Sequence, residues 1–289
     1  MSERGRLPDF IIIGSMKAGT TSLYEYLRAH PDVFMPAVKE LDFFVSELNW
    51  RRGLDWYASR FASVPNGTAC VGEASTSYTK YPRYDGVSAR IRAHLPDVRL
   101  VYSVRDPVER VRSHHQHNVK LGEESEPIDR AIRTNPAYLD YTRYATQIER
   151  YLEHFPRDRI FVITAEALRH DRRATVARVC DFLGIRPDLD ADVLEREFYT
   201  TSGRPTYGRS VAFVRNALKR ALPSRVALWR GTYLARPVKR ALGRFGDGPN
   251  GSASAVPAET AAFIRAELAP EIDRLRRYLD DDLSAWGFA

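Results

Sequence analysis

The chain has 289 residues, of which 44% are hydrophobic, and a formal net charge of +7. This length and apolar content fit one α/β domain, or one domain with an insertion, and exclude a chain too polar to bury a core. Two cysteines are too few for a disulfide framework or a cysteine zinc site, so we expect both in the core. The start lacks an apolar signal segment, and no apolar run approaches the roughly 20 residues that span a bilayer. We therefore expect a cytoplasmic protein.

Apolar runs and helical patterns alternate along the chain. We expect strands at Phe10–Ile13, Ala69–Gly72, Arg99–Val104 and Arg159–Thr164, and helices at Thr21–Ala29, Val87–His94, Val108–Leu121, Tyr141–His154 and Thr175–Leu183, with Gly184 ending the last. Such alternation predicts a parallel α/β sheet. Residues 202–256 are basic and broken by Gly and Pro, which predicts a mobile insertion within a single domain spanning 1–289. Helix is expected to resume at Ala258–Leu268, to pause at Pro270 and to run to about Leu283.

The loop between the first strand and the first helix is the most informative segment. It runs from Gly14 through Lys17 and Gly19 into three hydroxyl residues, Thr20, Thr21 and Ser22. Backbone N–H groups at a helix start attract anions, and the helix dipole favours negative charge there. Glycines let the backbone turn and approach a ligand closely. We expect a phosphoryl-type anion to bind here; the alternative is an ordinary turn with a surface lysine.

This loop differs from the nucleotide-binding P-loop, which reads G-x-x-x-x-G-K-[ST]. Gly14 and Gly19 have the P-loop spacing, but Thr20 follows the second glycine and the lysine lies inside the loop, at Lys17. The spacing therefore predicts an anion site with a rearranged lysine.

A second segment, Val104 to Ser113, directly follows the third predicted strand. Pro107 fits the first turn of a helix and Asp106 fits its N-cap. Arg105 would stand at the carboxyl end of a strand, where ligands bind in open α/β sheets, and a guanidinium can hold a phosphate with two hydrogen bonds. Ser113 lies two helical turns further on. The alternative is that Arg105 pairs with a carboxylate and Ser113 is merely exposed.

A third segment, Lys39 to Phe44, places two carboxylates beside two aromatic residues. A carboxylate near a bound anion can act as a general base, and Glu40 is the candidate. If the segment is extended, Asp42 points to the opposite side. The alternative is a solvated loop whose aromatic residues enter the core.

The three segments together resemble sulfotransferases that use 3′-phosphoadenosine-5′-phosphosulfate (PAPS), especially the branch of heparan sulfate sulfotransferases and many bacterial enzymes. Gly53–Tyr57 also resembles a block of that family, and Ala269–Ile272 with Leu283–Trp286 resembles its ending. The resemblance covers most of residues 8–200 and about the last thirty. It implies a P-loop-like three-layer α/β fold with a central parallel sheet flanked by helices.

The resemblance also implies roles for individual residues. Donor binding falls to Ser15, Lys17, Ala18, Gly19, Thr20, Thr21 and Ser22 at the 5′-phosphosulfate and to Arg105, Ser113 and Arg209 at the 3′-phosphate. Glu40 matches the base, and Lys17 would stabilise the leaving phosphate. The implied reaction is in-line transfer of a sulfuryl group from PAPS to a hydroxyl of a sugar, glycolipid or small molecule, without a metal.

The chain departs from the heparan-type pattern at one position. Those enzymes have Glu-Lys-[Ser/Thr] where this chain has Glu73-Ala74-Ser75, so a second active-site lysine is missing. Lys39 and Lys80 are candidates to replace it. The histidines at 114, 115 and 117 would fan over different faces of a helix, so we expect surface or acceptor-side histidines rather than a metal site.

Two other functions fit parts of the sequence. A P-loop kinase would need a lysine after Gly19 and an acidic Mg²⁺ ligand ending a strand, where this chain has Arg105. A nucleic-acid-binding protein would fit the pI of about 9.4, but it would cluster basic and aromatic residues on one face. We expect a hydroxyl acceptor and no nucleic-acid partner.

Overall fold

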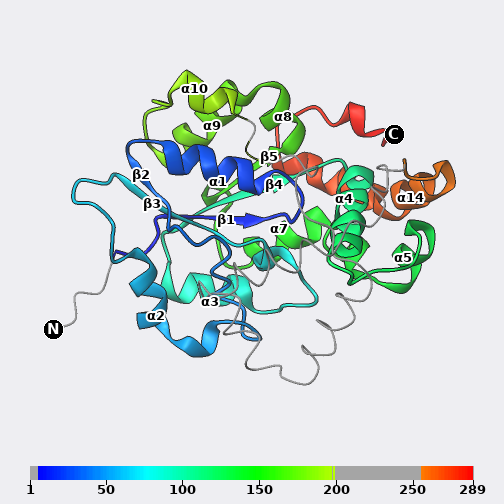
Figure 1. Ribbon diagram of the computed structural model, residues 1–289, viewed down its shortest axis with the longest axis horizontal. Coiled ribbons are helices and arrows are strands. Elements are labelled where there is room, and N and C mark those ends of the chain that lie inside the picture. The colour runs from blue at the N-terminus through cyan, green and yellow to red at the C-terminus, as the bar shows by residue number, and fades with distance from the viewer. Residues whose placement is uncertain (1–5, 197, 199–254, 289) are drawn as a thin grey trace, which may run out of the picture.

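A parallel sheet forms the centre of the computed structural model, which describes residues 6–196, 198 and 255–288 (Figure 1). Its strands are β1 (Phe10–Gly14), β2 (Val33–Phe34), β3 (Cys70–Ala74), β4 (Arg99–Val104) and β5 (Ile160–Thr164), in the order β2-β3-β1-β4-β5. All neighbours pair in parallel. The four predicted strands are confirmed within one or two residues at their ends. The edge strand β2 was not predicted, because two residues are too few to show a period.

Helices cover both faces of this sheet (Figure 1). They are α1 (Thr20–Ala29), α2 (Leu54–Ala58), α3 (Val87–His94), α4 (Pro107–Lys120), α5 (Ile128–Thr134), α6 (Ala137–Asp140), α7 (Tyr144–Leu152), α8 (Ala165–His170), α9 (Arg172–Leu183), α10 (Ala191–Glu195) and α14 (Ala258–Leu275). Phe10 and Ile12 pack with α1, α8, α9 and α10, whereas Ile11 and Ile13 pack with α3, α4, α7 and α14. Because both faces of the sheet are covered, neither side of β1 is exposed to solvent, which explains its continuous apolar run.

The helix ends follow local chemistry. The Asp106 side chain accepts a hydrogen bond from the Glu109 N–H at 2.8 Å, and Pro107 occupies the first turn of α4. Gly184 ends α9 in the left-handed conformation, with φ 71°. Both ends confirm the sequence predictions. Cys70 and Cys180 are buried, also as predicted.

The prediction of a break at Pro270 was wrong. α14 continues through Pro270 and ends at Leu275, short of the predicted Leu283. Leu268 and Ile272 are both fully buried on either side of the proline, so the apolar stripe continues across it. Packing of this stripe outweighs the backbone hydrogen bond that a proline removes.

The carboxyl ends of β1, β3 and β4 lie at the same edge of the sheet, because the three strands are parallel neighbours. The three segments singled out in the sequence all adjoin this edge. Arg209 and nearly all of the predicted insertion at 202–256 lie outside the described residues. No helix in the described part of the chain is long and apolar enough to cross a membrane.

Candidate active site

The loop between β1 and α1, residues 15–19, is folded back tightly on the sheet. Gly14 has φ 153°, and a Cβ at this position would lie 1.9 Å from the Thr79 hydroxyl oxygen. Gly19 has φ 79° and directly precedes α1. Only glycine meets both demands without strain, so the two glycines are explained by a close approach and a left-handed turn.

Ser103 of β4 fixes both ends of this loop. Its carbonyl oxygen accepts from the Ser15 N–H at 2.7 Å, and its hydroxyl donates to the Ala18 carbonyl at 2.6 Å. Ser103 was not predicted as a site residue, although a serine within the apolar run of β4 was a visible signal. The loop is therefore held in shape by the neighbouring strand.

The same loop fits an anionic ligand. α1 begins without an acidic residue in its first turn and without a side-chain cap, so its N-terminal N–H groups are open to an anion. The Ser15 hydroxyl is buried and has no hydrogen-bond partner among the described residues. Buried polar atoms are nearly always paired, and a phosphoryl or sulfuryl oxygen would pair this one.

Lys39 and Glu40 lie directly beside the loop. The Lys39 ammonium lies 3.4 Å from the hydroxyl oxygens of both Thr20 and Thr21 and 2.9 Å from Glu40 Oε1. Glu40 Oε2 accepts from the backbone N–H of Thr76 at 2.8 Å and from its hydroxyl at 3.0 Å. The first and third sequence segments therefore meet, through a lysine that the prediction named only as a candidate replacement.

The electrostatic surroundings of Glu40 favour its ionised form. Burial raises the pKa of its carboxyl, but the Lys39 ammonium and the Thr76 donors outweigh burial, and the pKa lies below its usual value. Glu40 is thus ionised at neutral pH.

The segment around Glu40 is not extended, so the condition under which Asp42 would point to the opposite side is not met. Glu40 has φ 63° and Asp42 has φ 49°, both in the left-handed region. The backbone is held there because the Asp42 N–H donates to the Ser75 hydroxyl at 2.9 Å and the Glu40 N–H donates to the Ala74 carbonyl at 2.9 Å. Strand alternation therefore does not decide which carboxylate faces the loop.

Arg105 pairs with a carboxylate, as the alternative hypothesis expected, and it also contacts the loop. Its Nη1 donates to the Lys17 carbonyl at 3.3 Å, which joins the second segment to the loop, and its Nη2 pairs with Glu109 at 3.2 Å. The Tyr144 hydroxyl fixes the backbone by donating to the Arg105 carbonyl at 2.8 Å. Ser113 lies on α4 and is 6% exposed, so the alternative of an exposed serine was wrong.

α4 also carries a buried cation and a buried histidine, Arg110 and His114. Arg110 is fully buried, and its Nη2 donates to the Tyr138 carbonyl at 2.8 Å. Burial first, and then the charges of Arg110, Lys80, His117 and Lys17, lower the pKa of His114 to about 2. His114 is buried against Tyr138, so the expectation of a surface histidine was wrong at this position. In the described ranges, no three His, Cys, Asp or Glu side chains come together as a metal site.

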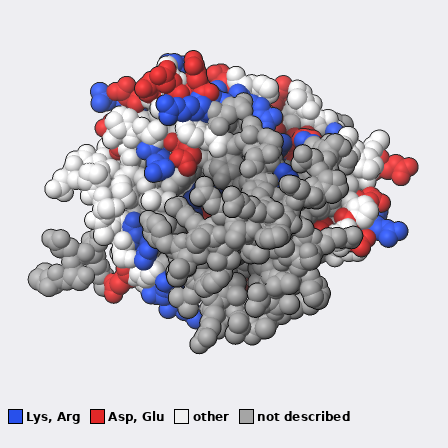
Figure 2. Space-filling model, in the orientation of Figure 1, with Lys and Arg blue, Asp and Glu red and all other residues white. Residues whose placement is uncertain are grey.

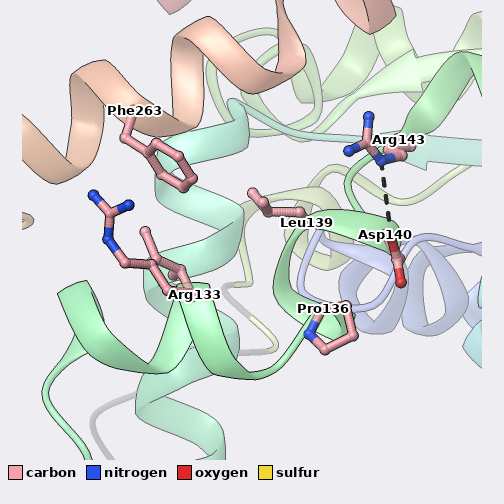
Figure 3. Close-up of a pocket in the computed structure, with 7 residues that line it drawn as sticks. Arg133, Pro136, Leu139, Asp140, Arg143 and Phe263 are labelled. Atoms are coloured by element: carbon pink, nitrogen blue, oxygen red, sulfur yellow. Dashed lines mark ion pairs between the residues drawn. The ribbon is translucent and has the colours of Figure 1, made fainter.

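A hollow of about 360 Å³ lies between α5, α6 and α14 (Figure 3). Its lining residues are Ile132, Arg133, Pro136, Leu139, Asp140, Arg143 and Phe263. The Arg133 guanidinium lies 4.4 Å from the centre of the Phe263 ring, and Arg143 pairs with Asp140 at 3.8 Å. Among the described residues that line this hollow, none was singled out for donor binding or catalysis.

The family model described as "Sulfotransferase domain" matches residues 7–215. The chain belongs to the sulfotransferase domain family. It is therefore a transferase, and its β1–α1 loop, Glu40 and Arg105 are the candidate active site of a sulfotransferase.

Curated sulfotransferases share part of this sequence. Heparan sulfate glucosamine 3-O-sulfotransferase 3B1 of Mus musculus is 30% identical over 211 residues, which are 69% of this chain and 51% of that protein. Bifunctional heparan sulfate N-deacetylase/N-sulfotransferase 3 of Homo sapiens is 29% identical over 204 residues, 63% of this chain and 23% of that protein. The match thus spans about half of the first relative and about a quarter of the second.

Solved structures confirm the P-loop-like fold with a central parallel sheet flanked by helices. A sulfotransferase from Alicyclobacillus acidocaldarius has a TM-score of 0.68 at 26% identity, over 98% of this chain and 99% of that chain. Mouse sulfotransferase SULT7A1, solved in complex with PAP, has a TM-score of 0.52 at 14% identity, over 97% of this chain and 87% of that chain. The second likeness concerns the fold alone.

Proposed function

We propose that this sulfotransferase moves a sulfuryl group from PAPS to a hydroxyl of a sugar, glycolipid or small-molecule acceptor. One observation carries the proposal. The Glu40 carboxylate and the Thr20 and Thr21 hydroxyls contact the same ammonium, that of Lys39. A base is therefore adjacent to the helix N-terminus that fits the anionic part of a donor.

In this proposal, the acceptor oxygen attacks sulfur in line. A bond forms between the acceptor oxygen and sulfur, while the bond between sulfur and the phosphate oxygen breaks. The acceptor proton passes to the Glu40 carboxylate. Negative charge develops on the departing phosphate oxygen, where the Lys17 ammonium and the loop N–H groups would stabilise it.

Donor orientation is assigned to the second segment. Arg105 and Ser113 would hold the 3′-phosphate, with Arg209 as a third contact. This phosphate takes no part in bond making, but its contacts fix the donor in position for attack. Ser15, Ala18, Gly19, Thr20, Thr21 and Ser22 would hold the 5′-phosphosulfate. No metal is assigned, since lysine and backbone dipoles can neutralise the charge.

A carbohydrate hydroxyl is the first acceptor to test. The two relatives described above are named for heparan sulfate, but the match spans only about half of one and about a quarter of the other. Sugar oligomers are therefore tested first, and glycolipids and small alcohols second. Transfer is followed with radiolabelled PAPS, and the product is identified by mass spectrometry.

The decisive variants are Glu40→Gln and Asp42→Asn. Both remove one charge from the same short segment and keep the size of the side chain. We expect Glu40→Gln to bind PAPS normally and lose most turnover, because it cannot accept the acceptor proton. Asp42→Asn should be much milder.

Initial rates on an aliphatic alcohol or sugar and donor titrations measure the two effects separately. A phenol is unsuitable because it needs little help from a base. An active Glu40→Gln beside an inactive Asp42→Asn would show that the base is misassigned.

A further inference from the structure

Lys39 lies between the proposed base and the proposed donor loop. Its ammonium contacts Glu40 Oε1 at 2.9 Å and the Thr20 and Thr21 hydroxyl oxygens at 3.4 Å. The Lys39 side chain is 17% exposed, so this charge is largely screened from water. A partly desolvated ammonium interacts strongly with any anion that enters beside it.

The threonine contacts leave an anion room to bind. An ammonium has donors only, so both hydroxyl oxygens accept from Lys39 and their hydrogens point away from it. Those hydrogens can donate to an anion at the N-terminus of α1. The two contacts are long for hydrogen bonds and therefore weak, so an incoming anionic oxygen can replace them.

We propose that Lys39 is a catalytic residue whose ammonium contacts the transferred sulfuryl group. This inference rests on the proposed function. Lys39 forms no covalent bond and releases no proton. It holds the sulfuryl oxygens on the side facing Glu40, so that the acceptor hydroxyl enters between the base and sulfur. No lysine of β3 is available for this task, because Ala74 ends that strand.

Lys39 also acts on the protonation of Glu40. Two cations lower the pKa of that carboxyl, Lys39 beside it and Lys80 after the 3₁₀ turn at Thr76–Thr79. The Lys80 ammonium lies at a different position from that of Lys39, since it contacts the Ser77 hydroxyl, at 3.4 Å, and not the threonines of α1. The two lysines therefore share an effect on the base, whereas Lys39 alone is assigned a contact with the sulfuryl group.

The test compares binding of PAPS with binding of adenosine 3′,5′-bisphosphate (PAP), which lacks the sulfuryl group. Calorimetric titrations without acceptor use the wild type, Lys39→Met, Lys39→Arg and Lys80→Met. We expect Lys39→Met to lose about tenfold more affinity for PAPS than for PAP, as expected for one charged hydrogen bond. Lys39→Arg keeps the charge and should recover part of the difference. Lys80→Met should weaken both ligands to a similar degree.

Turnover supplies a second readout. We expect Lys39→Met to lower kcat about a hundredfold, in line with loss of one preorganised donor at the transition state. The acid limb of its kcat/KM profile should move to higher pH, because Glu40 loses its closest cation. Lys80→Met should move the limb in the same direction without the preference for PAP. Arg28→Met, which removes an exposed cation from the far end of α1, should match the wild type.

Two results would overturn the inference. Equal losses of PAPS and PAP affinity in Lys39→Met would place the ammonium at the phosphate, and unchanged binding with unchanged turnover would make it a surface ion pair. A folded wild type that neither binds PAP nor transfers sulfate from PAPS would overturn the proposed function first, and this inference with it. Thermal unfolding of each variant establishes that it is folded.

Discussion

Arg105, which is proposed to bind the donor, also has a structural role. Its guanidinium contacts the Lys17 carbonyl at 3.3 Å and the Glu109 carboxylate at 3.2 Å. An anion near the guanidinium would compete with that carboxylate. Whether Arg105 binds the donor is thus a question about ligand chemistry, because the contacts within the chain exist in either case.

We expect Arg105→Ala to weaken PAP binding by about 2–4 kcal/mol, the typical loss of a desolvated charge contact. Adenosine 5′-phosphate lacks the 3′-phosphate, so its binding should weaken far less. Calorimetry with both nucleotides measures the difference. The matched control is Arg112→Ala, because Arg112 pairs with the same Glu109 carboxylate at 2.5 Å. Equal losses for the two nucleotides would assign Arg105 to loop support alone.

Residues of this kind also mark the limit of prediction from sequence. Arg105 and Glu40 could be chosen because each stands next to a strand or helix end in a recognisable segment. The roles of Ser103 and Thr76 could not be predicted, because each contacts a group that is distant in sequence, the Ala18 carbonyl and the Glu40 carboxylate. Such contacts depend on strand register.

At the scale of elements, the end of β3 supports the segment that carries Glu40. The buried Glu73 carboxylate accepts from the Ser75 hydroxyl at 2.6 Å, the Tyr78 hydroxyl at 2.8 Å and the Tyr57 hydroxyl at 2.5 Å. Ser75 and Tyr78 in turn accept from the N–H groups of Asp42 and Phe44. One carboxylate therefore orients two hydroxyls that fix the backbone beyond Glu40.

This network predicts how stability depends on pH. Burial outweighs the three hydroxyl donors and raises the pKa of Glu73 to about 7. Between its usual pKa and 7, folded Glu73 holds a proton that the unfolded chain releases. The stability that this group contributes is therefore full at low pH and is lost as pH rises through 7, by about 3 kcal/mol. Urea unfolding of the wild type and Glu73→Gln at pH 5 and 8 should show this loss only in the wild type.

Tyr57→Phe provides the matched control for that experiment. It removes one donor to the Glu73 carboxylate while keeping the aromatic ring stacked on Phe43. The pKa of Glu73 should then rise further, and the loss of stability should extend to higher pH. An identical pH dependence in wild type and Glu73→Gln would show that another group is responsible.

Helices and strands could be predicted where burial produces an apolar run or a helical period over several residues. β4 and α3 have the predicted bounds, because an apolar run and a helical period both extend over several residues. Short elements such as β2 and α10 were not predicted, since tertiary contacts rather than local pattern stabilise them. α14 shows the same effect at Pro270, where packing overrides a local helix-breaking signal.

At the scale of the whole molecule, the charge pattern bears on the alternative functions. On the face shown in Figure 2, basic and acidic side chains of the described residues lie interspersed. The visible described surface therefore offers no broad basic face of the kind that tracks a nucleic-acid backbone. The basic charges that matter to the proposed function are instead those near the sheet edge, including Lys17, Lys39 and Arg105.

Ligand stabilisation of the whole fold tests these functions together. A ligand that binds only the folded chain raises stability by about 2.7 kcal/mol at one hundred times its Kd. For a domain of this size we expect PAP to raise Tm by about 5–10 °C. ATP with Mg²⁺ should raise it much less, because ATP lacks a 3′-phosphate for Arg105 and β4 is followed by an arginine where a kinase needs an acidic Mg²⁺ ligand. An oligonucleotide should have little effect at physiological salt, where nonspecific phosphate contacts are weak.

Differential scanning fluorimetry with the three ligands at matched concentrations measures these shifts. A larger shift with ATP and Mg²⁺ than with PAP would favour phosphoryl transfer, and a larger shift with the oligonucleotide would favour nucleic-acid binding; either result would contradict the proposed donor.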